Sequence, residues 1–353
     1  MSFKKFFFDF SKPNRLILAV ILILTLILIL FSFGNQNDRP QVLKIGFITD
    51  AHCRGDFNDS GNWELKKECQ KPLLSFVENM NQQFNPDVIL DGGDLIEGNQ
   101  DFEESKKTWI KASGILNKIK APVFFVLGNH ELDKFTKKQW LDLTDQENPY
   151  YFFDKNGYRI IVLDGNFLKL KNQEIDINPS NKFYPGYVNS SQIKWLKEIL
   201  QDSQNYQKVV FIHQPPIKKT TVKNRSQLLL NYEELNRLFE KHQVLAVFSG
   251  HIEEFCHIQN KGVEYFSLQG FVKGQKLLNP KDRFENQGLF YQIVLKDGEA
   301  KVKAYFKKDP ALGYESFEIN QNTVICNNHS LSLKQHKQPA SNWQKIKNMV
   351  LND

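Results

Sequence analysis

Apolar runs that end in polar residues recur along the first part of the chain. Six runs rich in β-branched and aliphatic residues predict buried strands. They lie at residues 42–50, 87–94, 121–131, 158–165, 208–216 and 244–251. Apolar residues at helical spacing predict helices between them, at 62–84, 102–119, 189–203 and 232–242. This order of strands and helices is typical of an α/β domain with at least one sheet covered by helices.

The pattern changes after residue 260, where apolar and polar positions alternate. Residues 263–270 and 289–306 predict strands, and Asp297-Gly298 inside the second stretch predicts a hairpin turn. Residues 311–353 are polar and rich in Asn and Lys, and their structure is left open.

Residues 16–33, LILAVILILTLILILFSF, contain no charged side chain. At about 1.5 Å per residue a helix of this length reaches roughly 27 Å, close to a hydrocarbon core of about 30 Å. A buried core helix would usually show a polar face, which this segment lacks. The run is longer than the roughly 7–15 residues of a cleaved signal, so a transmembrane signal anchor is favoured over a signal peptide.

The charges before this segment set its orientation. Lys4, Lys5, Lys12 and Arg15 against Asp9 place a net +3 in residues 1–15, out of +6 for the whole chain. We therefore expect a cytoplasmic basic segment at 1–15, a linker at 34–41 and an extracytoplasmic remainder. The remaining +3 is too mild to predict a nucleic-acid partner.

The composition is otherwise that of a globular protein, with 41% hydrophobic and 24% charged residues. The four cysteines, Cys53, Cys69, Cys256 and Cys326, form no CxxC pair. Outside the cytoplasm they could form disulfides, and the alternative is buried thiols. The number of cysteines does not choose between these or give a pairing.

Five of the predicted strand ends carry side chains that ordinary turns would not require together. They are Asp50 and His52, Asp94, Asn129 and His130, His213, and His251 with Glu253. In open α/β sheets, ligands bind beyond the carboxyl ends of the strands, so these side chains are expected to converge. Carboxylate oxygens mixed with imidazoles suit Mn²⁺, Fe, Zn²⁺ or Mg²⁺. The pattern predicts a metal site.

The ordered series resembles the calcineurin-like metallophosphoesterase superfamily, whose motifs run D-x-H, G-D, G-N-H-E/D, H and G-H-x-H. The motifs here are Asp50-Ala51-His52, Gly93-Asp94, Gly128-Asn129-His130-Glu131, His213 and Gly250-His251-Ile252-Glu253. The resemblance implies an α/β fold of two mixed β-sheets flanked by helices in four layers. It would cover residues 42–308, followed by a C-terminal extension at 309–353.

The resemblance also implies two divalent metal ions, Mn²⁺, Fe or Zn²⁺, that share one carboxylate. The first site would contain Asp50, His52 and the bridging Asp94, with Glu253 in the position of the family's final histidine; the second would contain Asp94, Asn129, His213 and His251. A metal-bridging hydroxide would attack the phosphorus of a phosphate ester. His130 would be the general acid that protonates the leaving oxygen.

Glu97 occupies the position of an acid that orients the catalytic histidine in some members of the family. The alternative is a solvated loop acid. Gly98 stands where the protein-phosphatase branch has an arginine, so a phosphoprotein phosphatase is less expected.

Glu253 leaves three interpretations open. It is itself a metal ligand, His257 takes its place, or the first site is weakened. A carboxylate ligand would leave the site nearly neutral with two divalent ions and hydroxide, which favours phosphodiesters over dianionic monoesters. The chief alternative function is a membrane-tethered binding module that has lost catalysis. Residues 166–188 are the candidate specificity loop.

Overall fold

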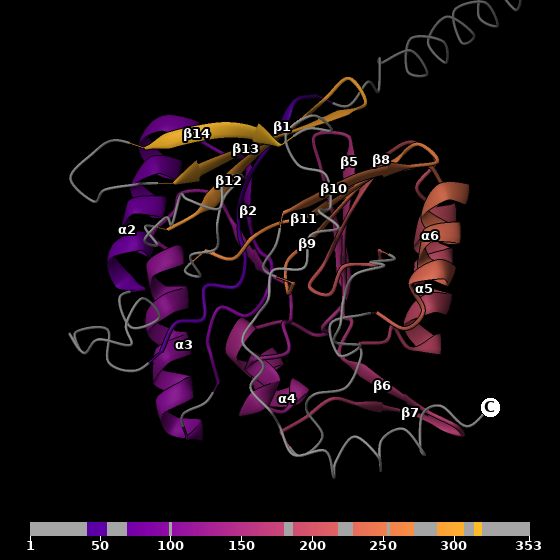
Figure 1. Ribbon diagram of the computed structural model, residues 1–353, viewed down its shortest axis with the longest axis horizontal. Helices are drawn as coiled ribbons and strands as arrows, with labels where there is room; N and C mark the ends of the chain where they lie inside the picture. Colours follow the sequence, from indigo (N-terminus) through magenta and orange to yellow (C-terminus); the bar gives the residue numbers. More distant parts are fainter. Residues whose placement is uncertain are drawn as a thin grey trace, which may run out of the picture. The chain divides into compact units, whose positions relative to one another are not determined.

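Two six-stranded mixed β-sheets form the centre of the described part of the chain (Figure 1). The computed structural model describes residues 41–54, 69–98, 101–179, 186–217, 229–252, 255–271, 288–306 and 314–319, all within the unit Pro40–Asp353. The first sheet has the order β14 (Glu315–Ile319), β13 (Glu299–Phe306), β12 (Phe290–Lys296), β1 (Leu43–Ile48), β2 (Val88–Asp91), β3 (Val123–Phe125). The second has the order β10 (Cys256–Asn260), β11 (Val263–Ser267), β9 (Val244–Ser249), β8 (Gln207–Ile212), β5 (Tyr158–Leu163), β4 (Tyr151–Lys155).

The two sheets pack face to face. Their shared core contains Phe47 of β1 and Phe211 of β8, whose ring centroids are 5.7 Å apart. Phe248 of β9 stacks on Phe211 at 5.1 Å. Large aromatic rings between the sheets bury the apolar face of each, which stabilises this pairing.

Helices cover the outer face of each sheet. On the first sheet they are α2 (Gln70–Asn79), its π-helical continuation Met80–Phe84, α3 (Phe102–Leu116) and α4 (Lys137–Thr144). On the second they are α5 (Ser190–Gln201) and α6 (Tyr232–Lys241). The result is the expected four-layer order of helices, sheet, sheet and helices (Figure 1).

Within each sheet, the strands that lead into the predicted motifs run parallel to one another. β1 pairs with β2 and β2 with β3, while β5 pairs with β8 and β8 with β9. Their carboxyl ends therefore lie at the same edge of each sheet, which brings the motif residues together.

The predicted hairpin is confirmed between β12 and β13. Asp297 and Gly298 both have positive φ, 51° and 79°, as a two-residue type I′ turn requires. The first sheet continues beyond residue 308, because β14 pairs with β13 with Val302 opposite Ile319. The candidate specificity loop at 166–188, which is inserted between β5 and α5, contains the hairpin of β6 (Phe167–Leu170) and β7 (Gln173–Asp176).

Helix α4 was not predicted, although its start carries a recognisable signal. Thr136 and Gln139 form a capping box, in which each side chain binds the other's backbone N–H. The helix is polar along most of its length, and Trp140 is its largest buried side chain. A helix with so narrow an apolar stripe gives a weak periodic signal.

The sequence left open whether the cysteines form disulfides or remain buried thiols, and the cysteines within the described residues form disulfides. Cys53 is bonded to Cys69, with Cα atoms 5.4 Å apart, and Cys256 is disulfide-bonded as well. The expected membrane segment at 16–33 lies outside the described residues. In the ranges that are described, no helix is long and apolar enough to cross a membrane.

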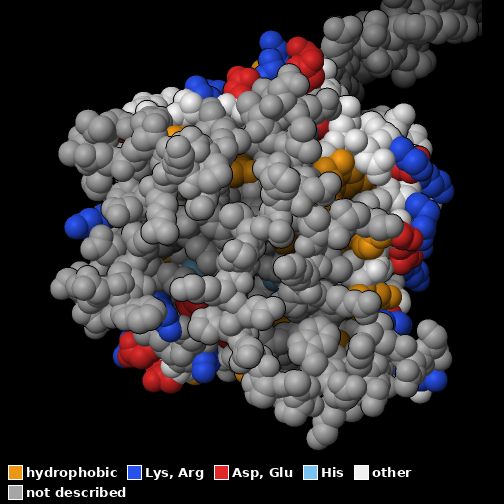
Figure 2. Space-filling view, in the orientation of Figure 1, with side chains coloured by type: hydrophobic (Ala, Val, Ile, Leu, Met, Phe, Trp, Pro, Cys, Tyr) orange, Lys and Arg blue, Asp and Glu red, His pale blue; other side chains and the backbone are white. Residues whose placement is uncertain are grey.

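The outer helices of the second sheet carry charges of both signs. Figure 2 shows Lys or Arg and Asp or Glu side chains interspersed over α5 and α6. Lys197 of α5 lies 3.7 Å from Glu234 of α6, and Arg237 lies 4.0 Å from Glu233 one turn earlier. This mixture is typical of a solvated surface.

Candidate metal centre and active site

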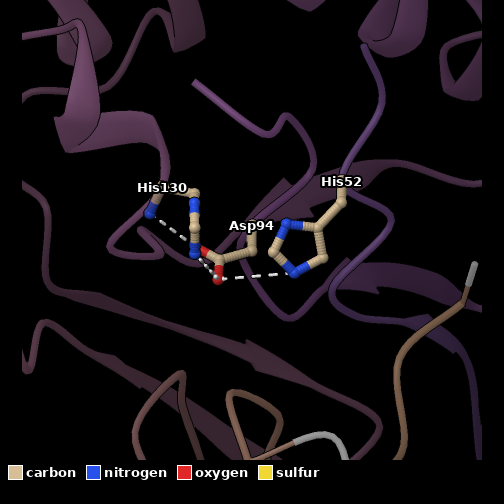
Figure 3. A group of neighbouring side chains, drawn as sticks. All are labelled: His52, Asp94 and His130. Atoms are coloured by element: carbon tan, nitrogen blue, oxygen red, sulfur yellow. Dashed lines mark hydrogen bonds and ion pairs between the residues drawn. The ribbon is translucent and has the colours of Figure 1, made fainter. Parts of the chain in front are cut away.

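Three histidines surround the carboxylate of Asp94. Its Oδ2 atom lies 3.1 Å from Nε2 of His213, 3.9 Å from Nε2 of His52 and 4.0 Å from Nε2 of His130. Figure 3 shows His52 and His130 approaching this carboxylate from different loops. Asp94, His52 and His213 are buried, whereas 31% of the His130 side chain is exposed. The histidine open to solvent is thus the predicted general acid.

Backbone hydrogen bonds fasten the first motif to the second. The N–H groups of Asp50, His52 and Cys53 donate to the carbonyls of Gly93, Asp94 and Leu95 at 2.9, 2.8 and 2.8 Å. These bonds continue the parallel pairing of β1 and β2 beyond the ends of both strands. The disulfide from Cys53 to Cys69 ties the same segment to the start of α2.

Four predicted ligands adopt the left-handed backbone conformation that L-residues rarely occupy. They are Asp50, His52, Asp94 and His251, with φ values of 52°, 47°, 56° and 67°. Such conformations cost of order 1–3 kcal/mol each and concentrate at functional sites. Their recurrence here turns the backbone sharply at each strand end.

Asp50 joins the first motif to the last. Its carboxylate accepts the backbone N–H of His251 at 3.0 and 3.1 Å and the Thr49 hydroxyl at 2.6 Å. Its Oδ1 atom lies 3.8 Å from Nε2 of His52. The structure therefore brings together Asp50, His52 and His251 as the motif order predicted.

A second buried carboxylate, Glu131, supports the loops from behind. It accepts backbone N–H groups of Asp94 at 3.0 Å, Ile96 at 3.2 Å and Gly128 at 3.1 Å. Burial, and then the nearby Asp94 charge, raise the pKa of Glu131 to about 7. The sequence placed Glu131 in a motif but gave no sign that it links two loops.

His213 is held so that one ring nitrogen faces Asp94. Its Nδ1 atom lies 2.8 Å from the carbonyl of Gly92, which orients the ring. In the metal-free chain burial lowers its pKa, but Asp94 and Asp50 outweigh this and raise the pKa to about 10. The same carboxylates that hold a proton there would attract a cation.

The described side chains fit a pair of metal ions. His52, Asp94 and His130 form one group and Asp94, His213 and His251 another, with ligand atoms within 4.8 Å of one another in each. Asp94 belongs to both groups. Asn129 has a buried Oδ1 atom without a hydrogen-bond partner in the described part of the chain. A buried amide oxygen of this kind is a suitable ligand for a hard cation.

The sequence offered Glu253 or His257 as the last ligand of the first metal site, and the structure describes only His257. Glu253 lies outside the described residues. Within the β10–β11 hairpin, His257 contacts Glu264 through Nε2, and its ring stacks on Phe266 with centroids 4.4 Å apart. This placement does not bring His257 into either described group of metal-ligating side chains.

Two acids, Glu97 and Asp133, lie near His130. The expectation was that the Glu97 carboxylate orients His130, but in the structure this carboxylate contacts His52. The Glu97 carboxylate lies 3.1 Å from Nδ1 of His52, and its backbone carbonyl lies 3.0 Å from Nδ1 of His130. The Asp133 carboxylate lies 3.2 Å from the same Nδ1 of His130. In the metal-free chain burial lowers the pKa of His130, whereas Asp94 and Asp133 raise it, to about 10.

Buried polar residues behind the site connect its loops. Asn166 donates to the carbonyl of Leu127 at 2.8 Å and accepts from Gln214, the residue after His213, at 2.7 Å. It also donates to Asp164 at 3.0 Å. These bonds fix the loop that begins the third motif relative to the loop that carries His213.

Fold and site together define a metal-dependent phosphoester hydrolase. The family model for calcineurin-like phosphoesterases matches residues 43–254, and the chain belongs to this family. The strand-end motifs that suggested the resemblance lie within the matched residues.

Several proteins of known activity are similar to the chain. A manganese-dependent ADP-ribose/CDP-alcohol diphosphatase from Arabidopsis thaliana is 27% identical over 237 residues, 57% of this chain and 76% of the relative. The Homo sapiens protein of the same name is 25% identical over 293 residues, 67% of this chain and 85% of the relative.

Solved structures share the fold. A dimetal phosphatase from Danio rerio aligns with a TM-score of 0.56 at 16% identity, covering 78% of this chain and 98% of that one. The purple acid phosphatase PPD1 from yellow lupin aligns with a TM-score of 0.51 at 14% identity, covering 84% and 58%.

Proposed function

We propose that the protein is a membrane-anchored, manganese-dependent hydrolase of phosphodiester-type bonds, and that its substrates contain a nucleotide diphosphate linkage. The observation that carries the proposal is the position of Asp94 in both groups of potential metal ligands, one of which also contains the partly exposed His130. The activity of the similar manganese-dependent diphosphatases supports the metal and the substrate class.

In this proposal Asp50, His52 and Asp94 hold one ion, with Glu253 as a further ligand, and Asp94, Asn129, His213 and His251 hold the other. When bound, the ions supply a water of lowered pKa and neutralise charge on the phosphoryl oxygens. The chain orients these ligands through Glu131 and the carbonyl of Gly92. His130 donates a proton from Nε2 to the leaving oxygen.

The charge at the site favours substrates with one negative charge per phosphoryl group. If Glu253 is a ligand, the site is one charge less positive than with histidine. One charge more or less changes the interaction energy with a second charge about 4 Å away by about 4 kcal/mol, even at an effective dielectric constant of about 20. Each phosphoryl group in a diphosphate diester carries a single negative charge, so this linkage fits the same preference.

Replacement of Glu253 tests this part of the proposal. We expect Glu253→His to raise turnover of p-nitrophenyl phosphate relative to bis-p-nitrophenyl phosphate, and Glu253→Ala to lower manganese content. Unchanged manganese content and unchanged turnover in Glu253→Ala would remove Glu253 from the site.

The membrane anchor at residues 16–33 is supported by the charge-free run and by the disulfides of Cys53 and Cys256. Disulfides persist mainly in oxidising compartments, in agreement with an extracytoplasmic domain. Fractionation of cells that express the full chain, followed by carbonate washing, tests this. Retention in the membrane pellet is expected, and release of the intact chain would contradict an anchor.

Turnover by the detergent-solubilised full chain with Mn²⁺ tests the activity. ADP-ribose, CDP-choline, bis-p-nitrophenyl phosphate and p-nitrophenyl phosphate are compared at equal concentration. We expect the diphosphates and the diester to be hydrolysed faster than the monoester, and chelation with EDTA to abolish turnover. Two bound manganese ions without turnover of any substrate would instead favour a binding module.

A further inference from the structure

A buried ion pair lies between α4 and the hairpin of β6 and β7, outside the metal centre. Lys137 is the first residue of α4, and its side chain is 8% exposed. Its Nζ atom lies 2.5 Å from Oδ2 of the completely buried Asp164 and 2.8 Å from Oδ1 of Asp176. The same atom lies 3.2 Å from the centre of the Phe167 ring. None of these residues belongs to the motifs of the metal centre.

The contacts of Lys137 converge on the base of the hairpin. Phe167 is the first residue of β6 and Asp176 is the last residue of β7, and the two lie opposite each other in the antiparallel register. The next residue, Ile177, packs into the same apolar core as Trp140 of α4. Separating a buried ammonium from its carboxylates is unfavourable, so the ion pair resists sliding of the hairpin along the helix.

Asp164 connects this ion pair to the loops of the metal centre. Its Oδ1 atom accepts the backbone N–H of Asn166 at 2.8 Å and the side-chain amide of Asn166 at 3.0 Å. The Asn166 side chain in turn donates to the carbonyl of Leu127 and accepts from Gln214. Leu127 directly precedes the third motif, and Gln214 directly follows His213. One polar network therefore runs from the base of the hairpin to two loops that carry predicted metal ligands.

We infer that Lys137 is a positioning residue for substrate selectivity, which it exerts through the hairpin of β6 and β7. The inference rests on the proposed function. The hairpin follows the carboxyl end of β5, and loops at this edge of a sheet contact the parts of a substrate that extend beyond the reacting group. In a nucleotide diphosphate these parts are the second phosphoryl group and the organic group attached to it. Lys137 holds the hairpin where it contacts them, whereas a small diester does not reach the hairpin.

Selectivity is measured as the ratio of kcat/KM for CDP-choline to kcat/KM for bis-p-nitrophenyl phosphate, in the detergent-solubilised full chain with Mn²⁺. Lys137→Met alone would leave the Asp164 carboxylate buried without its cation, which destabilises the fold. The double variant Lys137→Met/Asp164→Asn removes both charges at similar side-chain volume. We expect the ratio to fall about 10- to 100-fold in this variant, mainly through a higher KM for CDP-choline, because a displaced hairpin loses its contacts with the substrate.

Two further variants separate this contact from a general effect of charge. Lys138→Met removes an exposed cation of α4 that pairs with Asp142 at 2.9 Å, and the ratio should stay within about twofold of wild type. Asp176→Asn removes the carboxylate at the end of β7, and it should lower the ratio in the wild-type chain but not in the double variant, because both changes act through one contact. Asp176 is 57% exposed, so this variant carries the test if the double variant does not fold.

An unchanged ratio, or an equal loss on CDP-choline and on the small diester, would overturn the inference. Failure of the wild-type chain to hydrolyse either substrate would refute the proposed function instead. Hydrogen exchange of the hairpin amides then tests the role of Lys137 without turnover. Exchange in β6 and β7 should be at least about tenfold faster in the double variant than in wild type, with β5 unchanged. Equal exchange of the hairpin in both chains would overturn the positioning role.

Discussion

The Nε2 atom of His213 lies 3.1 Å from Oδ2 of Asp94, although the two residues follow strands of different sheets. Asp94 follows β2 of the first sheet, and His213 follows β8 of the second. Where the two sheets meet at their strand ends, the contact is made by a carboxylate and an imidazole. This relationship allows one carboxylate to serve both metal-ligand groups.

Replacement of Asp94 by asparagine is expected to weaken Mn²⁺ binding about 100-fold or more, because the shared negative charge is lost from both groups. Calorimetric titration of the full chain measures this. Asp297→Asn in the β12–β13 turn is the matched control, since asparagine suits that turn. Similar Mn²⁺ affinity in Asp94→Asn and the control would remove Asp94 from the site.

Replacement of Asn129 by alanine should separate metal binding from folding. The Oδ1 atom of Asn129 has no hydrogen-bond partner in the described residues, so its loss should cost the metal-free protein less than about 1 kcal/mol. A tenfold weaker site would lower the stabilisation by saturating Mn²⁺ by about 1.4 kcal/mol. Thermal unfolding with and without Mn²⁺ tests this, and an equal loss in both conditions would contradict it.

Loss of the Cys53–Cys69 disulfide is expected to lower the free energy of unfolding by about 3 kcal/mol, the value for a loop of this size. The two cysteines are 16 residues apart in sequence. The double variant Cys53→Ser/Cys69→Ser is preferable to a reductant, because Cys256 is disulfide-bonded too. Urea denaturation gives the change, and Mn²⁺ affinity should fall as well because Cys53 follows His52.

The pH dependence of stability should report the contact between the inserted hairpin and α5. The Glu174 carboxylate of β7 accepts a hydrogen bond from the backbone N–H of Ser190 at 2.8 Å. It also forms an ion pair with Lys169, whose Nζ atom lies 2.9 Å from Oε1. Burial alone would raise its pKa, but these contacts outweigh burial and lower the pKa to about 2 from 4.5. A depressed pKa stabilises the fold above pH 4.5, and the gain is lost as the pH falls towards 2.

Glu174→Gln should therefore be less stable than wild type by about 1 kcal/mol at pH 6, and the difference should vanish as the pH approaches 2. Urea midpoints at several pH values measure it. Glu147→Gln, an exposed acid, is the control. A difference that grows as the pH falls would have the wrong sign for this contact.

Much of the fold followed from continuous apolar runs. β5 and β9 are almost wholly buried, so each is a continuous apolar run that predicts a strand from its own residues alone. The elements that escaped prediction lie at edges or surfaces. β4 alternates partly buried and exposed positions at the edge of its sheet, and α4 buries a single tryptophan deeply.

The sequence predicted which residues belong to the site, but not which of their side chains contact one another. The order of the motifs brought Asp94 and His213 into the same prediction, because each follows a strand in a parallel pair. Whether His130 meets the carboxylate or the carbonyl of Glu97 depends on the conformation of Gly98 and on the turn that carries Asp133. Such a choice rests on backbone geometry, which residue identity and spacing do not specify.

Electron paramagnetic resonance of the full chain titrated with Mn²⁺ tests the central claim most directly, since two ions that share the Asp94 carboxylate are magnetically coupled. The account predicts two manganese ions per chain at saturation and a coupled spectrum, which Asp94→Asn converts to that of isolated ions or free Mn²⁺. A single uncoupled ion in the wild-type chain, or a spectrum unchanged by Asp94→Asn, would contradict it.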